Sequence, residues 1–386
     1  MTDDWRNGGF GLYLHWPFCQ SKCPYCDFNS HVADRIDQKR WEAAYLSEID
    51  RIGAETEGRV LSTVFFGGGT PSLMQGDLVH AILDRVRQTW TQSNDLEVTM
   101  EANPGSVEAG RFADYAAAGV NRVSIGFQAL RDEDLRRLGR MHSVAEAGRA
   151  LDVARKSFER ISFDLIYARQ DQGKEAWRTE LMEALAMEPD HLSLYQLTIE
   201  DGTVFAERSR KGLLRGLPDE DLSVDLFELT QDLCEAAGLP AYEVSNHARP
   251  GQEARHNLIY WRLGDYAGIG PGAHGRLTLK GQRWATEAPR APGAWLDQVE
   301  RQAMGELARE PSSPEDHVTE YLLNALRLSE GAELSRFAAL GGRPMREDRL
   351  ASLVEGEFLI RVEDRIRTTR KGRMVLNAIL RELLLD

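Results

Sequence analysis

Three of the four cysteines in this 386-residue chain fall within eight residues, at Cys19, Cys23 and Cys26. Thiolates are the soft ligands that hold zinc or iron–sulfur clusters. A tetrahedral zinc site needs four ligands, and no fourth ligand is evident beside these three. A [4Fe–4S] cluster held by three cysteines would leave one iron open to bind and activate a small molecule. Considered alone, the three cysteines leave a structural or zinc site as the alternative.

The elements that must position the cysteines follow a strand-then-helix rhythm over residues 10 to about 200. Short apolar segments that alternate with helical patterns predict parallel βαβ units. Six units fit either a barrel or an open curved sheet, and counting strands does not decide between them. In both, the carboxyl ends of the strands share one rim, where α/β barrels keep their chemistry. The expected strands are 11–16, 61–66, 96–101, 122–126, 161–167 and 191–196, and the expected helices are 38–52, 77–89, 106–117, 144–156 and 174–187.

Further polar or glycine-rich motifs follow the later strands, so they should share the rim with the cysteines. Glycines at 67–69 let backbone groups approach a ligand closely, although ordinary turns also use them. Carboxylates at a strand end can bind a ribose or an ammonium, but they can also be helix caps or rim ion pairs. Their joint position beside the cysteines favours a functional site. The motifs are Gly67–Ser72, Glu101–Pro104, Gly126–Gln128, Arg140–His142 and Asp164.

Composition limits the function classes. The formal net charge of −14 argues against broad nucleic-acid binding, which needs a basic face. No run of eighteen apolar residues predicts a membrane span. The N-terminal residues are acidic and polar, unlike a signal peptide. Clustered cysteines do not form a disulfide framework, so a reducing cytoplasm is expected. Cys234 is expected to be a buried core residue.

The cysteine spacing C-x3-C-x2-C, with an aromatic residue before the last cysteine, resembles that of the radical S-adenosylmethionine (SAM) enzymes. The resemblance implies an α/β fold, a partial (β/α)6 barrel. It implies a [4Fe–4S] cluster on Cys19, Cys23 and Cys26, whose open iron chelates the amino and carboxylate groups of SAM. Reductive cleavage of SAM would then give a 5′-deoxyadenosyl radical. By the same resemblance, the residues around these cofactors are Tyr13, Tyr25, Gly68, Gly69, Thr70, Glu101, Gln128, Arg140 and Asp164.

The order of motifs resembles the coproporphyrinogen-oxidase-like branch of radical SAM proteins over nearly the whole chain. The dehydrogenase members have a fourth cysteine two residues after the third, where this chain has Phe28. That difference resembles the haem-chaperone members, the HemW family. Residues 256–261, His-Asn-Leu-Ile-Tyr-Trp, look like their HNxxYW motif, which implies that His256 ligates haem iron while Tyr260 and Trp261 pack on the porphyrin. The chain departs from the branch at residues 168–170, which are Ala-Arg-Gln instead of Gly-Leu-Pro.

The function implied is that of a haem chaperone that binds a [4Fe–4S] cluster and SAM and delivers haem to apo-haemoproteins of the respiratory chain. It would be cytoplasmic, with association at the membrane surface left open, as a monomer or dimer. The alternative is a radical SAM coproporphyrinogen III dehydrogenase, which oxidatively decarboxylates its substrate to protoporphyrinogen IX. Whether SAM is cleaved in the chaperone role stays open.

Three regions are expected: a core barrel over residues 1–200, a barrel extension over 201–309, and a winged-helix-like C-terminal domain over 315–386. A linker at 310–314 separates the last two. The extension should hold a helix at 219–237, a strand and turn at 242–246, and a glycine-rich segment at 266–275 that includes His274, a second candidate cofactor neighbour. Helices at 316–326, 333–340, 347–354 and 371–384, with a hairpin at 358–368, predict the winged helix. No basic recognition helix is evident, so DNA binding is disfavoured.

Overall fold

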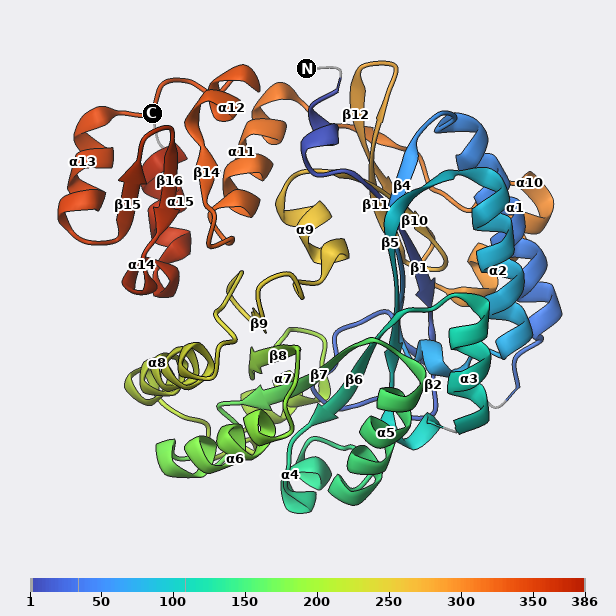
Figure 1. The fold of residues 1–386 in the computed structure, drawn as a ribbon, viewed down its shortest axis with the longest axis horizontal. Helices are drawn as coiled ribbons and strands as arrows, with labels where there is room; N and C mark the ends of the chain where they lie inside the picture. The colour runs from blue at the N-terminus through green and yellow to red at the C-terminus, as the bar shows by residue number, and fades with distance from the viewer. Residues whose placement is uncertain (1–2, 34, 108, 385–386) are drawn as a thin grey trace.

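Within the part of the chain that the structure describes, eleven strands form one curved sheet in the order β13-β12-β11-β10-β1-β4-β5-β6-β7-β8-β9 (Figure 1). The structure is a computed structural model that describes residues 3–33, 35–107 and 109–384. The strands from β10 to β8 are mutually parallel, and antiparallel strands extend both edges. The strands of this sheet are β1 (Phe10–Trp16), β4 (Val60–Gly68), β5 (Thr91–Ala102), β6 (Arg122–Gln128), β7 (Arg160–Tyr167), β8 (His191–Gln196), β9 (Asn246–Ala248), β10 (Asp265–Ile269), β11 (His274–Leu279), β12 (Gln282–Glu287) and β13 (Glu310–Pro311).

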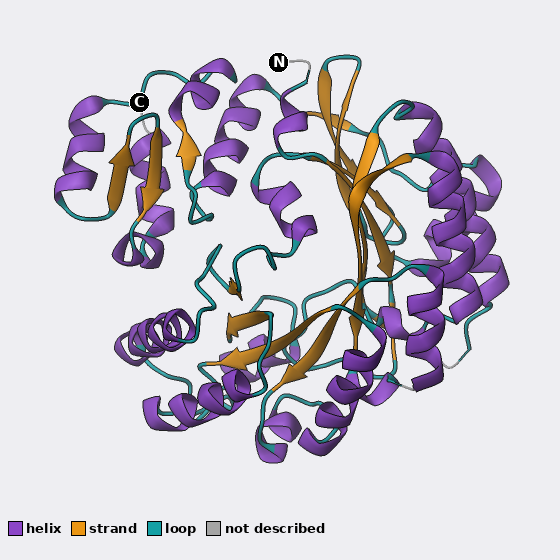
Figure 2. Cartoon of the chain, in the orientation of Figure 1, coloured by secondary structure: helices purple, strands orange, loops and turns teal. Residues whose placement is uncertain are grey.

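Helices between the parallel strands cover the convex side of the sheet and leave its concave side open (Figure 2). All six predicted strands and the five predicted helices between them are present, so the partial (β/α)6 barrel is confirmed. The helices of this part are η1 (Asp4–Asn7), α1 (Gln38–Glu55), η2 (Pro71–Leu73), α2 (Gly76–Thr89), η3 (Pro104–Ser106), α3 (Ala109–Ala118), α4 (Asp132–Arg137), α5 (Val144–Ser157), α6 (Lys174–Ala186), α7 (Val204–Arg210), α8 (Glu220–Ala236), α9 (Arg255–Trp261) and α10 (Pro292–Gln302).

An aromatic cluster fixes the carboxyl end of β1, from which the cysteine loop departs. The rings of Trp41 and Trp295 stack with centroids 5.4 Å apart, and Trp16 packs edge-on against Trp41. The buried hydroxyl of Tyr45 donates to the carbonyl of His15 over 2.6 Å. Aromatic side chains bury large areas with few rotamers. The last residues of β1 are therefore held rigidly just before the cysteines.

The region from 201 to 311 departs from the sequence expectation in three places. The predicted strand at 242–246 is a series of bends, and β9 begins only at Asn246 because Glu243 accepts from the backbone of Ser245 and the amide of Asn246. The glycine-rich segment contains β10 and opens β11. The expected linker contributes β13, which pairs with β12.

The C-terminal part has its own core and a three-stranded antiparallel sheet in the order β14-β16-β15. In this part, three helices are followed by a β-hairpin and two further helices, which fits the predicted winged-helix-like domain. The predicted last helix is divided in two at Val375. The elements are α11 (Pro314–Ala325), β14 (Ala332–Glu333), α12 (Leu334–Ala339), α13 (Glu347–Glu355), β15 (Leu359–Val362), β16 (Arg365–Thr368), α14 (Arg370–Met374) and α15 (Leu376–Leu384).

The C-terminal part packs beside α9, as Figure 1 shows, and the amide of Asn324 in α11 donates to the carbonyl of Tyr260 over 3.2 Å. Among the described residues, no helix is both long enough and apolar enough to cross a lipid bilayer.

Candidate functional site

The cysteine loop follows β1 at the carboxyl rim of the sheet. It includes a small parallel ladder between β2 (Phe18–Cys19) and β3 (His31–Val32). The amide of Phe205, at the start of α7, donates to the carbonyl of Pro24 over 2.9 Å. Gly139 packs so closely on the ring of Pro24 that an added Cβ would lie 2.5 Å from its Cδ. The loop is thus fastened to two other rim segments while its three thiols stay partly exposed.

Two side chains direct donors at the cysteine sulfurs, as sulfur ligands of a cluster require. The hydroxyl of Thr70 lies 3.4 Å from Sγ of Cys19, and Nη1 of Arg140 lies 3.4 Å from Sγ of Cys23. Burial raises the pKa of the Cys19 and Cys26 thiols, so metal binding would have to displace their protons. Hydrogen bonds to sulfur and a nearby guanidinium stabilise the thiolate form that binds metal.

No group of three or more histidine, cysteine or acidic residues converges on a single ion position within the described residues. A cube of four irons does not need such convergence, because each cysteine binds a different iron. Three free thiols on one loop, each partly open, fit a [4Fe–4S] cluster better than they fit mononuclear zinc.

The glycine turn lies directly against the end of β1. Gly68 has a φ of +115°, and a side chain there would lie 2.7 Å from Cε1 of His15. An added Cβ on Gly69 would lie 2.7 Å from the carbonyl oxygen of Phe18. Only glycine allows this approach. The turn therefore brings its backbone, and Thr70 after it, beside the cysteine loop.

Two carboxylates face the concave side of the sheet at this rim. Glu101, at the end of β5, accepts from the backbone N–H of Gly68 over 3.2 Å. Burial and the neighbouring Asp164 raise the pKa of Glu101 to about 8. Burial also raises the pKa of Asp164, although Ser193 and Ser124 hydrogen-bond to it, the latter over 3.0 Å. Among the described residues, no cationic group lies at hydrogen-bond distance from either carboxylate, so the pair is suited to accept hydroxyl or ammonium donors from a ligand.

The end of β6 carries a strained bulge. The β6–β7 register shifts between Ile125 and Gln128, and Gln128 has a φ of +70°. Such left-handed backbone at a non-glycine residue is costly and tends to occur at functional sites. Arg140 donates to the carbonyl of Gly126 over 3.2 Å, so the guanidinium links this bulge to the cysteine loop.

Of the two predicted tyrosines, Tyr13 lies in β1 before the cysteine loop and Tyr25 lies within the loop. The hydroxyl of Tyr13 is 2.9 Å from Nδ1 of His15, whose Nε2 is 2.9 Å from the carbonyl oxygen of Asn29. The ring of Tyr25 packs against Phe205 with centroids 6.3 Å apart. The structure thus gathers all the predicted cluster and SAM residues at one rim, and their roles stay predictions.

Residues 168–170, which are Ala-Arg-Gln instead of Gly-Leu-Pro, still form a turn, but other side-chain contacts hold it. Ala168 has a φ of +58°, the conformation that a glycine adopts without strain. Arg169 is buried and pairs with Glu180 over 2.6 Å and with Asp134 over 2.9 Å. These ion pairs, which the sequence did not reveal, fix the loop after β7.

His256, the predicted haem ligand, lies in the interior instead of on a cleft wall. Its side chain is 1% exposed, with Nδ1 2.6 Å from Oγ1 of Thr63 and Nε2 2.6 Å from the hydroxyl of Tyr260. Burial, with a smaller effect of Arg122, lowers the pKa of His256 to about 3, so the ring is neutral. In this conformation both ring nitrogens are occupied by protein partners.

A cleft of about 760 Å³ joins the rim to α9 and the C-terminal part. Its size suits a cofactor-sized ligand. Phe28 is 59% exposed at this cleft, which is unusual for so large an apolar ring. Sequence reasoning missed Tyr266, Arg290 and Glu320, which only the fold brings here. The walls are formed by Tyr13, His15, Asp27, Phe28, Asn29, Gly68, Glu101, Tyr260, Trp261, Tyr266, Gly272, His274, Arg283, Glu287, Arg290, Glu320 and Asn324.

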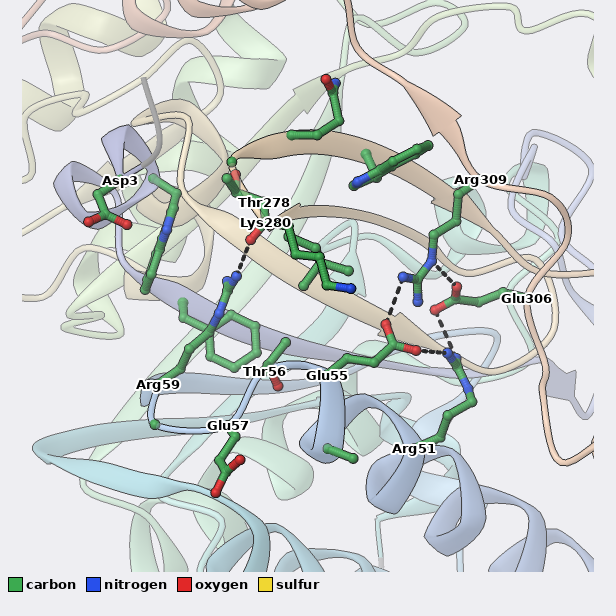
Figure 3. A pocket seen from close by; sticks show the side chains of 18 of the residues that line it. Asp3, Arg51, Glu55, Thr56, Glu57, Arg59, Thr278, Lys280, Glu306 and Arg309 are labelled. Atoms are coloured by element: carbon green, nitrogen blue, oxygen red, sulfur yellow. Dashed lines mark hydrogen bonds and ion pairs between the residues drawn. The ribbon is translucent and has the colours of Figure 1, made fainter.

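A larger cavity, of about 1430 Å³, opens at the opposite end of the strands (Figure 3). Four of its charged side chains form a network of ion pairs. Arg309 contacts Glu306 and Glu55, and Arg51 contacts the same two carboxylates (Figure 3). Since these groups already neutralise each other, this cavity offers less for binding a polar ligand than the cleft at the rim.

Known proteins share both halves of this architecture. Residues 13–179 match the model of the radical SAM superfamily, and residues 312–375 match the HemN C-terminal domain. The chain is 40% identical to the heme chaperone HemW of Escherichia coli K12 over 380 residues, with 96% of each chain covered. It is 36% identical to the heme chaperone HemW of Haemophilus influenzae, again with 96% of each covered.

A solved structure shows the same fold at lower identity. The coproporphyrinogen III oxidase HemN of Escherichia coli, described as a radical SAM enzyme, superimposes with a TM-score of 0.82 at 21% identity, covering 99% of this chain and 92% of that chain. At such identity the likeness concerns the fold alone. The full-length similarity to the two HemW proteins decides the family: the chain belongs to the HemW family of radical SAM proteins.

Proposed function

We propose that the chain is a haem chaperone that binds a [4Fe–4S] cluster and SAM at the rim, holds haem in the adjoining cleft, and delivers it to apo-haemoproteins of the respiratory chain. The observation that carries this proposal is the cleft itself. It is continuous from Tyr13, Gly68 and Glu101 to the aromatic residues Tyr260 and Trp261. A flat, apolar cargo with carboxylate edges would find aromatic walls there.

Cys19, Cys23 and Cys26 would hold the cluster, which when bound supplies an open iron for chelating SAM. The chain's own groups then orient the nucleoside. The half-buried Gly69 and the hydroxyl of Thr70 lie beside the cysteines, and the carboxyl of Glu101 faces the same space. Arg140 would hold the sulfur of Cys23 as thiolate by a charge-assisted hydrogen bond.

The aromatic groups of the cleft would pack on the porphyrin, with the ring of Trp261 held in place by the guanidinium of Arg327, 4.7 Å from its centroid. Tyr260 is fixed from behind by His256. The free thiols of the described cysteines suit a reducing compartment such as the cytoplasm. The chaperone would contact a membrane surface only where it meets an acceptor protein at that membrane.

Anaerobic reconstitution of the full chain with iron and sulfide, followed by addition of haem and SAM, tests the proposal. We expect a shifted Soret band, a cluster absorbance that is lost in a Cys19→Ser/Cys23→Ser/Cys26→Ser variant, and transfer of haem to an apo-cytochrome. Formation of protoporphyrinogen IX from coproporphyrinogen III, without a Soret change, would instead identify a dehydrogenase. Absence of both would reject the chaperone proposal.

A further inference from the structure

Two histidines, His15 and His274, line the cleft, and His256 lies in the interior next to it; the three differ in whether their ring nitrogens have protein partners. His15 and His256 are buried, and each has both nitrogens at hydrogen-bond distance from a protein group. His274 stands at the first position of β11 on the cleft wall, with 61% of its side chain exposed. An iron centre needs an imidazole nitrogen whose lone pair is free.

We propose that His274, and not His256, provides the axial imidazole to the iron of a porphyrin bound in this cleft. The inference rests on the proposed function, and it names the ligand within that same site. Among the described contacts of His274, the only acidic partner is Glu287, whose Oε1 lies 4.0 Å from Nε2. That distance is too long for a hydrogen bond. Among the described residues, neither ring nitrogen of His274 therefore has a hydrogen-bond partner, and the side chain stays open to a metal in the cleft.

The backbone holds His274 firmly although its side chain is free. An added Cβ on Gly268 would lie 2.0 Å from the carbonyl oxygen of His274, so the two strands touch at this point. His274 pairs with Glu287 in the β11–β12 ladder. The strand pairing therefore positions His274 beside the carboxylate of Glu287 before haem binds.

The surroundings of His274 match both the flat apolar faces of a porphyrin and its propionate carboxylates. Phe28 and Tyr266 offer rings on the cleft wall, and Phe28 has no apolar cover in the described chain. Arg290 stands exposed at the same cleft, and no side-chain ion pair of Arg290 is present among the described residues. Its guanidinium is available to a propionate carboxylate. His256 keeps Tyr260 in place, which gives the motif histidine a positioning role.

Haem titration of the full chain tests the assignment, with optical and electron paramagnetic resonance spectra that report imidazole ligation. We expect wild type and His256→Ala to show an imidazole-ligated iron, and His274→Ala to lose that signature. Added free imidazole should restore the signature to His274→Ala, because the cavity left by the side chain admits it. His80→Ala is the matched control, since His80 on α2 is 57% exposed and also faces an aspartate.

Three negative results are possible, and they do not have the same meaning. If wild type binds no haem, both the proposed function and the ligand assignment fall. If wild type binds haem and His274→Ala keeps the imidazole signature while His256→Ala loses it, the ligand assignment alone is wrong. Retention of the signature in both single variants would likewise overturn it.

Discussion

A single residue, Glu101, makes the stability of the cofactor-free protein depend on pH. Its pKa is raised from an ordinary 4.5 to about 8 by burial and by Asp164. The folded state therefore holds a proton that the unfolded state has lost between these two values. The stability contribution of this group is fully present below about pH 4.5 and is lost as the pH rises toward 8. Urea unfolding at pH 5.5 and pH 8 should show this fall in wild type and a smaller one in Glu101→Gln. Parallel curves for the two proteins would contradict the prediction.

Ala168 gives a second prediction at this scale. A non-glycine residue in the left-handed region costs about 1–2 kcal/mol, whereas glycine loses about 0.5–1 kcal/mol more chain entropy on folding. Ala168→Gly should therefore raise the free energy of unfolding by about 0.5–1 kcal/mol. Chemical denaturation measures this change. Ala116→Gly, within helix α3, is the control and should lower the same quantity by about 1 kcal/mol. Equal destabilisation of both variants would show that Ala168 is not strained.

At the scale of elements, helix α9 depends on one carboxylate. Oε1 of Glu97, on β5, accepts from the amide of His256 over 3.1 Å, and Oε2 accepts from the amide of Arg255 over 3.2 Å and pairs with Arg160. The first N–H groups of a helix have no partner within it, and a negative charge there is favourable. Glu97→Ala should cost roughly 3–5 kcal/mol, because Arg160 would lose its buried partner.

Hydrogen exchange can locate that loss. Amides of 255–261 should exchange faster in Glu97→Ala, together with a lower melting temperature. The control is Glu300→Ala, which removes an exposed carboxylate from a similar arginine pair with Arg40 and should cost no more than about 1 kcal/mol. Unchanged exchange at α9 would mean that tertiary packing, and not Glu97, holds the helix.

The sequence predicted the elements with strong periodicity and missed those with short or glycine-rich patterns. Six of the parallel strands are apolar runs between amphipathic helices, so their positions were predictable. Strands β10 and β11 were not, because glycines such as Gly268 and Gly275 weaken the strand signal. They are present because the backbones of adjacent strands pack where a side chain would not fit. His274 acquired its place on the cleft wall from this pairing.

For the site, too, the sequence predicted some features and missed others. Motif spacing was enough to name the residues at the rim, since strand ends meet at one edge. It could not show that His256 points into the core, because the orientation of α9 is set by Glu97 and Thr63, which are distant in sequence. Nor could motif spacing show that α11 forms part of the cleft wall, because this depends on how the C-terminal part docks.

At the scale of the whole molecule, Arg336 joins three parts of the chain. From α12 it donates to both carboxylate oxygens of Asp4 in η1 over 2.9 and 2.8 Å, and to the carbonyl of Arg262 after α9 over 2.9 Å. Both side chains of the pair are largely buried. Burial raises the pKa of Asp4, but the hydrogen bonds and charge of Arg336 outweigh that effect and hold it below its ordinary value of 3.8. The pair therefore stabilises the docked arrangement at all pH values above about 4, and the stabilisation is lost as the pH falls below that value.

Arg336→Met should consequently loosen the docking of the C-terminal part and so open the cleft. Removing one partner of a bidentate, largely buried pair leaves the carboxylate of Asp4 with only the hydrogen bond from the Asn7 amide and no charged partner, which costs about 1–3 kcal/mol. We expect faster hydrogen exchange in residues 4–9 and 255–263 and weaker haem binding. The cluster absorbance should be retained, because contacts from outside the C-terminal part, such as that from the amide of Phe205 to the carbonyl of Pro24, hold the cysteine loop. Arg365→Met is the control, since Arg365 pairs with Glu333 inside the C-terminal part. If both variants changed haem binding equally, the cleft would depend on the internal stability of that part and not on its docking.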